Sequence, residues 1–303
     1  MTENVQERDL IGYGGSPPRI AWPNGTRLAV SVVVNFEEGA EWQVGDGDAR
    51  SEAVGEVLSV VPPGARDLGQ EQIFAYGMRV GFWRFLEALD RYHIPATFFC
   101  CGRAIERAPG LAKEIVERGH EPACHGWRWR PHADYADEAA ERVDIERCLQ
   151  VTEAATGERP EGFFCRGSES PWTRKLLAEL GFTYASNAFD DDLPYDDPTG
   201  LVVLPYALDS NDMKFFHPNG FARAKEFVGY VEDALAQLLA EAEHGRSALL
   251  NIGFHLRIAG RPARFRAVEA IFQALADLGD DIWLARRIDI ARHYQRTRKG
   301  NLS

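Results

Sequence analysis

The stretch LAVSVVVNFEEG, residues 28–39, runs from an almost continuously apolar segment directly into two adjacent carboxylates and a glycine. Four of its residues are valines, and together with the neighbouring apolar residues they predict a strand that is buried on both faces, as in parallel sheets covered by helices. Charged side chains have little reason to follow such a strand unless it ends at an opening. The roles of Glu37 and Glu38 are therefore the central question of the sequence.

The same alternation of short apolar runs and amphipathic segments recurs along the whole chain. Further strands are expected in PATFFCCG, HEPACHG, EGFFCRG, FTYASN, GLVVLPY, SALLNIGFH and DIWLA. Helical spacing of apolar residues is found from Gln70 to about Tyr92, and helical patterns separate most of the other strands. Strands alternating with helices pair in parallel through right-handed crossovers. We therefore expect an α/β fold, an irregular (β/α) barrel of about seven parallel strands.

An open doubly wound sheet is the alternative fold. It is disfavoured because no Gly-rich loop follows a strand in the pattern that a dinucleotide needs. The chain of 303 residues shows no composition shift or linker, so we expect one catalytic domain over residues 1–303. Within it, residues 1–27 are rich in Gly, Pro and Asn and are expected to form an N-terminal arm.

The bulk composition limits the classes of partner. A hydrophobic fraction of 45% with 26% charged residues is typical of a globular protein, and the net charge of −12 argues against nucleic acid or an anionic membrane surface. No apolar stretch approaches the roughly 18 residues of a membrane span. The N-terminus lacks the apolar core of a signal peptide, and the five cysteines, without a Cys-x-x-Cys pair, are expected to be buried free thiols. A cytoplasmic location is therefore expected.

Polar residues gather where the predicted strands end, which is where parallel barrels carry their chemistry. They are Glu37, Glu38, His125, Arg166, Asp190, Asp191, Asp192, Asp209, Asn211, Asp212 and His255. Two neighbouring carboxylates near a buried strand repel each other, so the pKa of one of them is raised unless a cation neutralises the pair. A carboxylate with a raised pKa is suited to act as a general base. Taken singly, each residue also has a structural explanation: a helix cap, an ion pair, a hydrogen-bonded core histidine, or, for 190–192, a solvated loop.

Together these residues suit the hydrolysis of an acyl–nitrogen bond. A carboxylate takes a proton from water, a histidine protonates the departing nitrogen, and an arginine or a backbone N–H holds the oxyanion. The nucleophile-elbow pattern G-x-S-x-G is absent, and RGSESP does not match it. Water is therefore the expected nucleophile.

The motifs NFEEG, GHEPACHGW, Arg166, FDDDLPY, SNDM and IGFHLRIAGRPAR, in this order, resemble those of the polysaccharide deacetylase (NodB-homology) superfamily. More narrowly, they resemble its branch of metal-independent bacterial allantoinases and cyclic imidases. The resemblance extends from residue 8 to residue 294. It implies a NodB-type barrel and a hydrolase of non-peptide carbon–nitrogen bonds, with Glu37 at the position of the base, Glu38 at that of a metal ligand and His255 at that of the general acid.

Two departures from the family pattern concern the cofactor and the substrate. The zinc-binding motif His-Ser/Thr-x-x-His reads His125-Gly-Trp-Arg-Trp129, and tryptophan cannot ligate. Glu38 and His125 alone fall short of the three protein ligands of a catalytic zinc, so no metal cofactor is expected. The alternative is Zn²⁺ held by Glu38, His125 and His132. The third motif, Arg166-Gly-Ser-Glu-Ser-Pro171, also differs from Arg-x-Pro-Phe/Tyr-Gly, which weakens a role in sugar binding.

The sequence thus predicts an allantoinase-like or cyclic-imide amidohydrolase acting on a small amide, ureide or imide. Glu37, His255 and Arg166 are the predicted catalytic residues. The predicted substrate-binding residues are Glu38, His125, Trp129, Asn211, Asp212, Arg257 and Arg261. The resemblance also implies a homo-oligomer, such as a tetramer. Two alternatives stay open: a metal-dependent N-deacetylase of polysaccharide or peptidoglycan, and a catalytically inactive barrel retained for binding.

Overall fold

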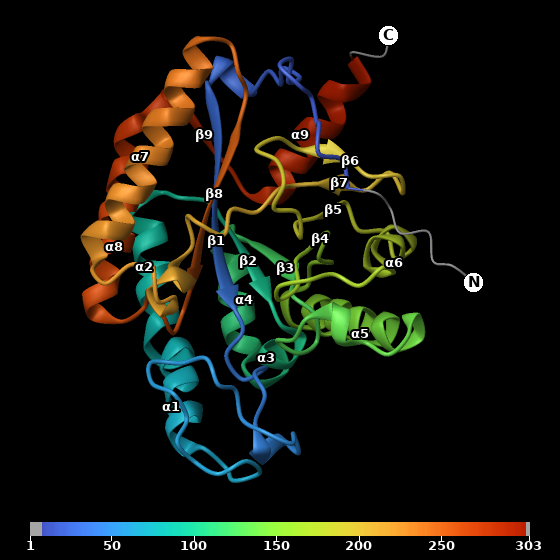
Figure 1. Ribbon diagram of the computed structural model, residues 1–303, viewed down its shortest axis with the longest axis vertical. Helices are drawn as coiled ribbons and strands as arrows, with labels where there is room; N and C mark the ends of the chain where they lie inside the picture. Colours follow the sequence, from blue (N-terminus) through green and yellow to red (C-terminus); the bar gives the residue numbers. More distant parts are fainter. Residues whose placement is uncertain (1–7, 301–303) are drawn as a thin grey trace.

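A mostly parallel sheet, curled into a half-barrel with helices around it, organises residues 8–300, which are the residues that the computed structural model describes (Figure 1). Its strands are β1 (Leu28–Phe36), β2 (Ala96–Cys100), β3 (Glu121–Cys124), β4 (Gly162–Phe163), β5 (Tyr184–Ala185), β6 (Tyr195–Asp196), β7 (Val202–Val203), β8 (Leu249–His255) and β9 (Ile282–Leu284). The strand order is β6-β7-β5-β4-β3-β2-β1-β8, and β9 pairs with β1. The predicted α/β barrel of NodB type is confirmed in this curled form.

The helices follow the predicted alternation. They are α1 (Leu68–Tyr76), α2 (Phe82–Tyr92), α3 (Gly102–Arg107), α4 (Pro109–Glu117), α5 (Glu138–Thr156), α6 (Thr173–Glu179), α7 (Ala224–Glu243), α8 (Pro262–Leu278) and α9 (Arg287–Gly300). In Figure 1, α2, α7 and α8 lie on one side of β1, while α3, α4 and α5 lie beside β2 and β3. No helix in residues 8–300 has the length and apolar character needed to cross a membrane.

Three local features differ from the simple alternation. The helix predicted over 70–92 contains a π-turn, Gly77–Gly81, between α1 and α2. The segment predicted as one helix after β2 is two, because Pro109 begins α4 and cannot continue α3. No helix joins β5 to β7; instead the two-residue strand β6 pairs antiparallel with β7, while the other strand pairs are parallel.

Both faces of β1 are buried, as the sequence predicts, and the strand is 100% covered along its nine residues. Val30, Val32 and Val34 pack toward α2, α7 and α8 in the larger hydrophobic cluster. Ala29 and Val33 face the inside of the half-barrel and belong to a second cluster. Glu37 and Glu38 follow directly after this buried strand, at its carboxyl end.

Part of the predicted N-terminal arm closes the base of the half-barrel. Trp22 is 4% exposed and packs beside Trp283 of β9 and His293 of α9. Ile20 exchanges two backbone hydrogen bonds with the hydroxyl of Ser247, of 2.9 and 3.0 Å. Residues 1–7 of the arm lie outside the described residues. All five cysteines are buried and free, as predicted.

Arg287, the first residue of α9, points into the half-barrel near the gap between β7 and β8. Its guanidinium is fully buried and donates to neutral acceptors only, at 2.6–3.0 Å. The acceptors are Ser186 Oγ, Ser31 Oγ, Asn251 Oδ1 and the carbonyl oxygens of Leu204 and Pro205. One side chain thus joins β1, β8 and the segments after β5 and β7, where no strand pairing closes the sheet.

We predict that Arg287→Met lowers the free energy of unfolding by on the order of 3–5 kcal/mol, because it leaves several buried acceptors without a donor. Urea denaturation measures the effect. Arg292→Met, on the same helix, removes a partly exposed ion pair with Glu161 and should change stability by less than about 1 kcal/mol. Equal effects of the two substitutions would contradict the structural role of Arg287.

Candidate active site

Glu37, one residue beyond β1, is the centre of a buried cluster of charged side chains. Its carboxylate is 1% exposed. Oε1 lies 3.1 Å from Nε2 of His125 and 3.4 Å from Nε2 of His255, and Oε2 accepts a 2.7 Å hydrogen bond from Nη1 of Arg257. His125 follows β3, His255 ends β8 and Arg257 follows β8; β8 pairs with β1, and β3 is separated from β1 by β2. The arrangement brings together four of the predicted site residues.

The neighbouring cations decide the charge of Glu37. Burial by itself raises the pKa of this carboxyl, but His255 and Arg257 outweigh it. Together with the hydrogen bonds from both histidines, they hold the pKa of Glu37 well below its usual range. Glu37 is therefore ionised at neutral pH and able to accept a proton.

His255 is held by Asp212, the first residue of the 3₁₀ turn Asp212–Phe216. Nδ1 of His255 donates to Oδ1 of Asp212 over 2.6 Å. Oδ2 of Asp212 accepts the backbone N–H groups of His255 at 2.8 Å and Ala259 at 3.0 Å. Asp212 is fully buried behind the imidazole, so its contacts fix the ring and leave Nε2 facing Glu37.

His255 carries the positive charge that faces the negative charge of Glu37. Burial alone would lower the pKa of the imidazole, but the carboxylates of Glu37 and Asp212 raise it to about 9. His255 therefore carries a proton at neutral pH. A protonated imidazole and an ionised carboxylate 3.4 Å apart form an acid and base pair.

His125 lies on the other side of Glu37. Its Nδ1 contacts the carbonyl oxygen of Phe164 at 2.5 Å, and the ring stacks on Phe164 at 5.2 Å. The carbonyl of Phe164 and the carboxylate of Glu37 are both acceptors, so the two ring nitrogens of His125 lie between two acceptors, with Nε2 toward Glu37. His125 therefore fixes one carboxylate oxygen of Glu37 in place.

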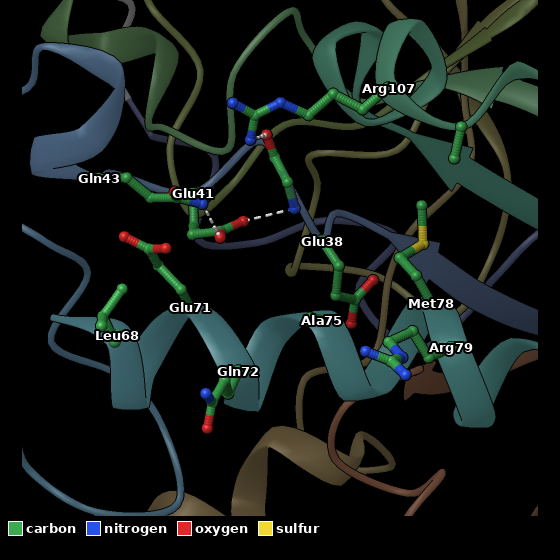
Figure 2. A pocket seen from close by; sticks show the side chains of 12 residues that line it. Glu38, Glu41, Gln43, Leu68, Glu71, Gln72, Ala75, Met78, Arg79 and Arg107 are labelled. Atoms are coloured by element: carbon green, nitrogen blue, oxygen red, sulfur yellow. Dashed lines mark hydrogen bonds between the residues drawn. The ribbon is translucent and has the colours of Figure 1, made fainter.

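Glu38 points toward helix α1 and lines a cavity of about 460 Å³ (Figure 2). Its Oε1 accepts the backbone N–H of Arg257 at 3.0 Å, and its Oε2 accepts the backbone N–H of Glu37 at 3.2 Å. Burial raises the pKa of Glu38 to about 7, since the attraction of Arg257 is partly offset by the charge of Glu37. Glu38 thus ties together the backbones that carry Glu37 and Arg257.

The π-turn brings the helix close to this point. A Cβ on Gly77 would lie 2.6 Å from Oε1 of Glu38 and 2.9 Å from the backbone nitrogen of Arg257. A Cβ on Gly81 would lie 2.1 Å from the carbonyl oxygen of Leu256. Only glycine permits both approaches, so this interruption of the helix shapes the site.

The structure places three predicted site residues outside the Glu37 cluster. Arg166 bonds Glu52 over 2.7 Å, and its Cζ lies 3.7 Å from the ring centre of Trp129. Arg261 lies over the ring of Tyr76 at 3.7 Å. Asn211 accepts the backbone N–H of Met213 and donates to the hydroxyl of Tyr206, so its amide is used within the fold.

The pair of Arg166 and Glu52 is one of several that hold the segment 44–57 at the carboxyl end of the sheet, seen at the bottom of Figure 1. Each acidic residue of this segment meets an arginine from another part of the site. The pairs are Asp46 with Arg103 and Arg107, Asp48 with Arg128, Glu52 with Arg166, and Glu56 with Arg264. Trp129, which lies beside Arg166, also lies 4.6 Å from the guanidinium of Arg257 and so links this segment to the Glu37 cluster.

The donors of the alternative zinc site do not converge. His132 is fully buried and bonds Glu141 at 2.9 Å, away from Glu38 and His125. Arg257 lies 2.7 Å from Glu37 and 3.5 Å from Glu38, so a cation already stands between the two carboxylates and would repel a metal ion. Within residues 8–300 there is no group of three His, Cys, Asp or Glu side chains arranged to hold a metal. The residues present do not fit zinc.

Two contributors to the site were not singled out from the sequence. Phe74 of α1 packs its ring 4.5 Å from the guanidinium of Arg257, and Glu52 holds Arg166. Phe74 belongs to an ordinary amphipathic pattern, and Glu52 lies in a long polar loop. Neither pattern contains a signal that separates these residues from their neighbours.

Sequence comparison supports the whole-chain resemblance. The family profile described as polysaccharide deacetylase matches residues 72–185. A protein of Schizosaccharomyces pombe (strain 972 / ATCC 24843), assigned by name to the polysaccharide deacetylases, is 32% identical over 311 residues, covering 95% of this chain and 96% of its own length.

Solved structures with the same fold are more similar still. A protein of Pseudomonas aeruginosa PAO1, also assigned by name to the polysaccharide deacetylases, superposes with a TM-score of 0.90 at 42% identity, covering 95% of this chain and 98% of its own. The structure of the PuuE allantoinase superposes with a TM-score of 0.90 at 40% identity, covering 96% of this chain and 97% of its own. The predicted resemblance is confirmed.

We predict that the imidazole of His255 titrates near pH 9, measured by NMR of its ring carbons. Because this pKa lies above the value of about 6.5 in an unfolded chain, the stabilisation from the bound proton is complete below about pH 6.5 and is lost as the pH rises through about 9. Asp212→Asn should lower the pKa of His255. A wild-type titration near pH 6.5 would contradict the charge pair.

Proposed function

This chain belongs to the polysaccharide deacetylase family, and we propose that it hydrolyses a carbon–nitrogen bond in a small cyclic amide, ureide or imide, as an allantoinase-like amidohydrolase. One observation carries the proposal: an ionised Glu37 faces a protonated His255 across 3.4 Å. Such a pair can take a proton from water and give one to a leaving nitrogen.

The proposed reaction conserves protons. Glu37 takes one proton from water while the water oxygen forms a bond to the acyl carbon, and the carbonyl π electrons move to the carbonyl oxygen. The electron pair on the oxyanion then re-forms the carbonyl π bond as the carbon–nitrogen bond breaks; the electrons of that bond pass to nitrogen, which takes the proton from Nε2 of His255. Glu37 and His255 are close enough for the proton on Glu37 to return to His255 and restore both groups.

The burial of the reacting groups supports a small substrate. Glu37 is 1% exposed, His255 5% and Arg257 0%. A polymer chain needs an open groove along the surface, whereas a small ring can be enclosed. The identity of 40% to the PuuE allantoinase over nearly the whole chain supports the same choice.

The donor set supports catalysis without a metal. The guanidinium of Arg257 lies between Glu37 and Glu38, and Trp129 occupies the position of a histidine ligand in the family motif. The positive charge beside the base therefore comes from the protein. The cytoplasmic location, the single domain with its arm and the homo-oligomer stay predictions, and size-exclusion chromatography with light scattering tests the last of them.

We predict that Glu37→Gln lowers kcat by about two to four orders of magnitude, because the amide cannot accept the proton of water. The assay follows ring opening of allantoin, succinimide and hydantoin by the purified enzyme. Glu232→Gln, on helix α7 and outside the site, is the matched control and should keep full activity. Near-wild-type turnover by Glu37→Gln would refute the assignment of the base.

We also predict that EDTA leaves the ring-opening activity unchanged and that elemental analysis finds less than one zinc per chain. Activity on N-acetylglucosamine oligomers that is lost with EDTA and restored by Zn²⁺ would instead establish a metal-dependent deacetylase. An enzyme that turns over none of these compounds but is stabilised by one of them would be the binding barrel.

A further inference from the structure

The guanidinium of Arg257 offers N–H groups for which no protein acceptor is found among the described residues. Nη1 is bonded to Glu37, but Nε and Nη2 are buried and have no hydrogen-bond partner. The side chain is fully buried. Leaving a buried donor unpaired destabilises the fold, so two such donors on one side chain point to a ligand that completes them.

The plane of this guanidinium is fixed before any ligand arrives. Its Cζ lies 4.5 Å from the ring centre of Phe74 and 4.6 Å from that of Trp129. Trp129 is in turn covered on its other side by Arg166, and the backbone N–H of Arg257 is held by Glu38. Donors that are already fixed need no reorganisation during a reaction, and such preorganised donors stabilise the charge of a transition state most effectively.

We propose that Arg257 is a catalytic residue whose Nε and Nη2 donors bind the acyl oxygens of the substrate, in the position that a metal ion fills in a metal-dependent hydrolase. The inference rests on the proposed hydrolysis and goes further, because it assigns the oxyanion to this arginine rather than to Arg166. Arg166 is already bonded to Glu52 and does not contact the Glu37 cluster.

The chemistry of the reaction matches the geometry of the donors. When water attacks an acyl carbon, the tetrahedral intermediate carries two oxygens on one carbon, and the carboxylate product keeps the same arrangement. Two parallel N–H groups of a guanidinium are suited to such an oxygen pair. The third nitrogen of the guanidinium, Nη1, donates to Glu37 over 2.7 Å. An acyl group bound by the other two nitrogens would therefore lie near Glu37, the proposed base.

This arrangement also defines a substrate class. The bound ring must open to a chain that ends in a carboxylate, as imides, hydantoins and other cyclic ureides do. The aromatic rings of Phe74 and Trp129 lie 4.5 and 4.6 Å from Cζ of Arg257, and an aromatic surface beside the guanidinium suits a flat ring. A planar ring with its carbonyl directed at Arg257 is therefore the expected substrate.

The test compares the wild type with Arg257→Lys, which keeps the charge beside Glu37 but removes the two parallel donors. We expect kcat for ring opening to fall by about 100- to 1000-fold at every pH from 5 to 9.5, with KM changed by less than about threefold. Binding of succinamate, the product of succinimide, should weaken at least about tenfold by calorimetry. Arg174→Lys is the control: Arg174 lies on helix α6 and pairs with Glu169, and the variant should match the wild type in both assays.

Several outcomes would overturn the proposal. One is a kcat of Arg257→Lys within about threefold of the wild type. Another is a loss that disappears at high pH, because Arg257 would then act only by keeping Glu37 ionised. If the wild type opens none of the rings, the proposed function fails separately. Succinamate then decides: binding lost only in Arg257→Lys supports the oxygen-binding fork, and absent or equal binding overturns it.

Folding is checked by thermal denaturation of each variant. Should Arg257→Lys not fold, Arg257→Gln is the second variant for the same assays. A measurement on the wild type needs no variant: arginine Nε–H resonances are recorded by NMR during a titration with succinamate. A shifted resonance of a solvent-protected Nε–H supports the proposal, and an unchanged spectrum at saturating succinamate overturns it.

Discussion

The ion pair between Glu37 and Arg257 is the interaction on which the site depends. A carboxylate buried at the end of a fully covered strand is tolerated only when a cation and further hydrogen bonds offset its desolvation. Arg257 provides the cation at 2.7 Å, and the two histidines provide contacts to the other oxygen. Without these partners, burial would raise the pKa of Glu37 and favour the neutral carboxyl.

The fold explains why these partners meet. In a parallel sheet the carboxyl ends of the strands lie at one edge, so β1, β3 and β8 deliver Glu37, His125 and His255 to a common place. The half-barrel is not closed by strand pairing between β7 and β8, and the buried Arg287 joins the two sides below the site. Two separate buried arginines thus have different roles: Arg287 joins the two sides of the half-barrel, and Arg257 neutralises Glu37.

Arg166 and Arg257 show that a position in a family motif does not by itself identify the arginine that contacts Glu37. The sequence predicts Arg166, a polar residue after a strand, as catalytic and Arg257 as substrate-binding. In the structure Arg166 pairs with Glu52 of the distant segment 44–57, whereas Arg257 is the arginine that reaches Glu37. The choice depends on loop geometry, which has no local pattern in the sequence. The same is true of Asp212, whose position behind His255 follows from one turn after a long irregular segment.

The sequence by itself determined the α/β class, the strand that leads into the two carboxylates and the family, because hydrophobic periodicity and short motifs are properties of neighbouring residues. It also indicated that a metal site was incomplete, since Trp129 replaces a ligand. The tertiary structure alone decided which cation neutralises Glu37, which carboxylate orients His255 and how the π-turn approaches Glu38. These features depend on contacts between residues that are distant in the sequence, such as Glu37 and Arg257, which are 220 positions apart. No local sequence pattern encodes such contacts.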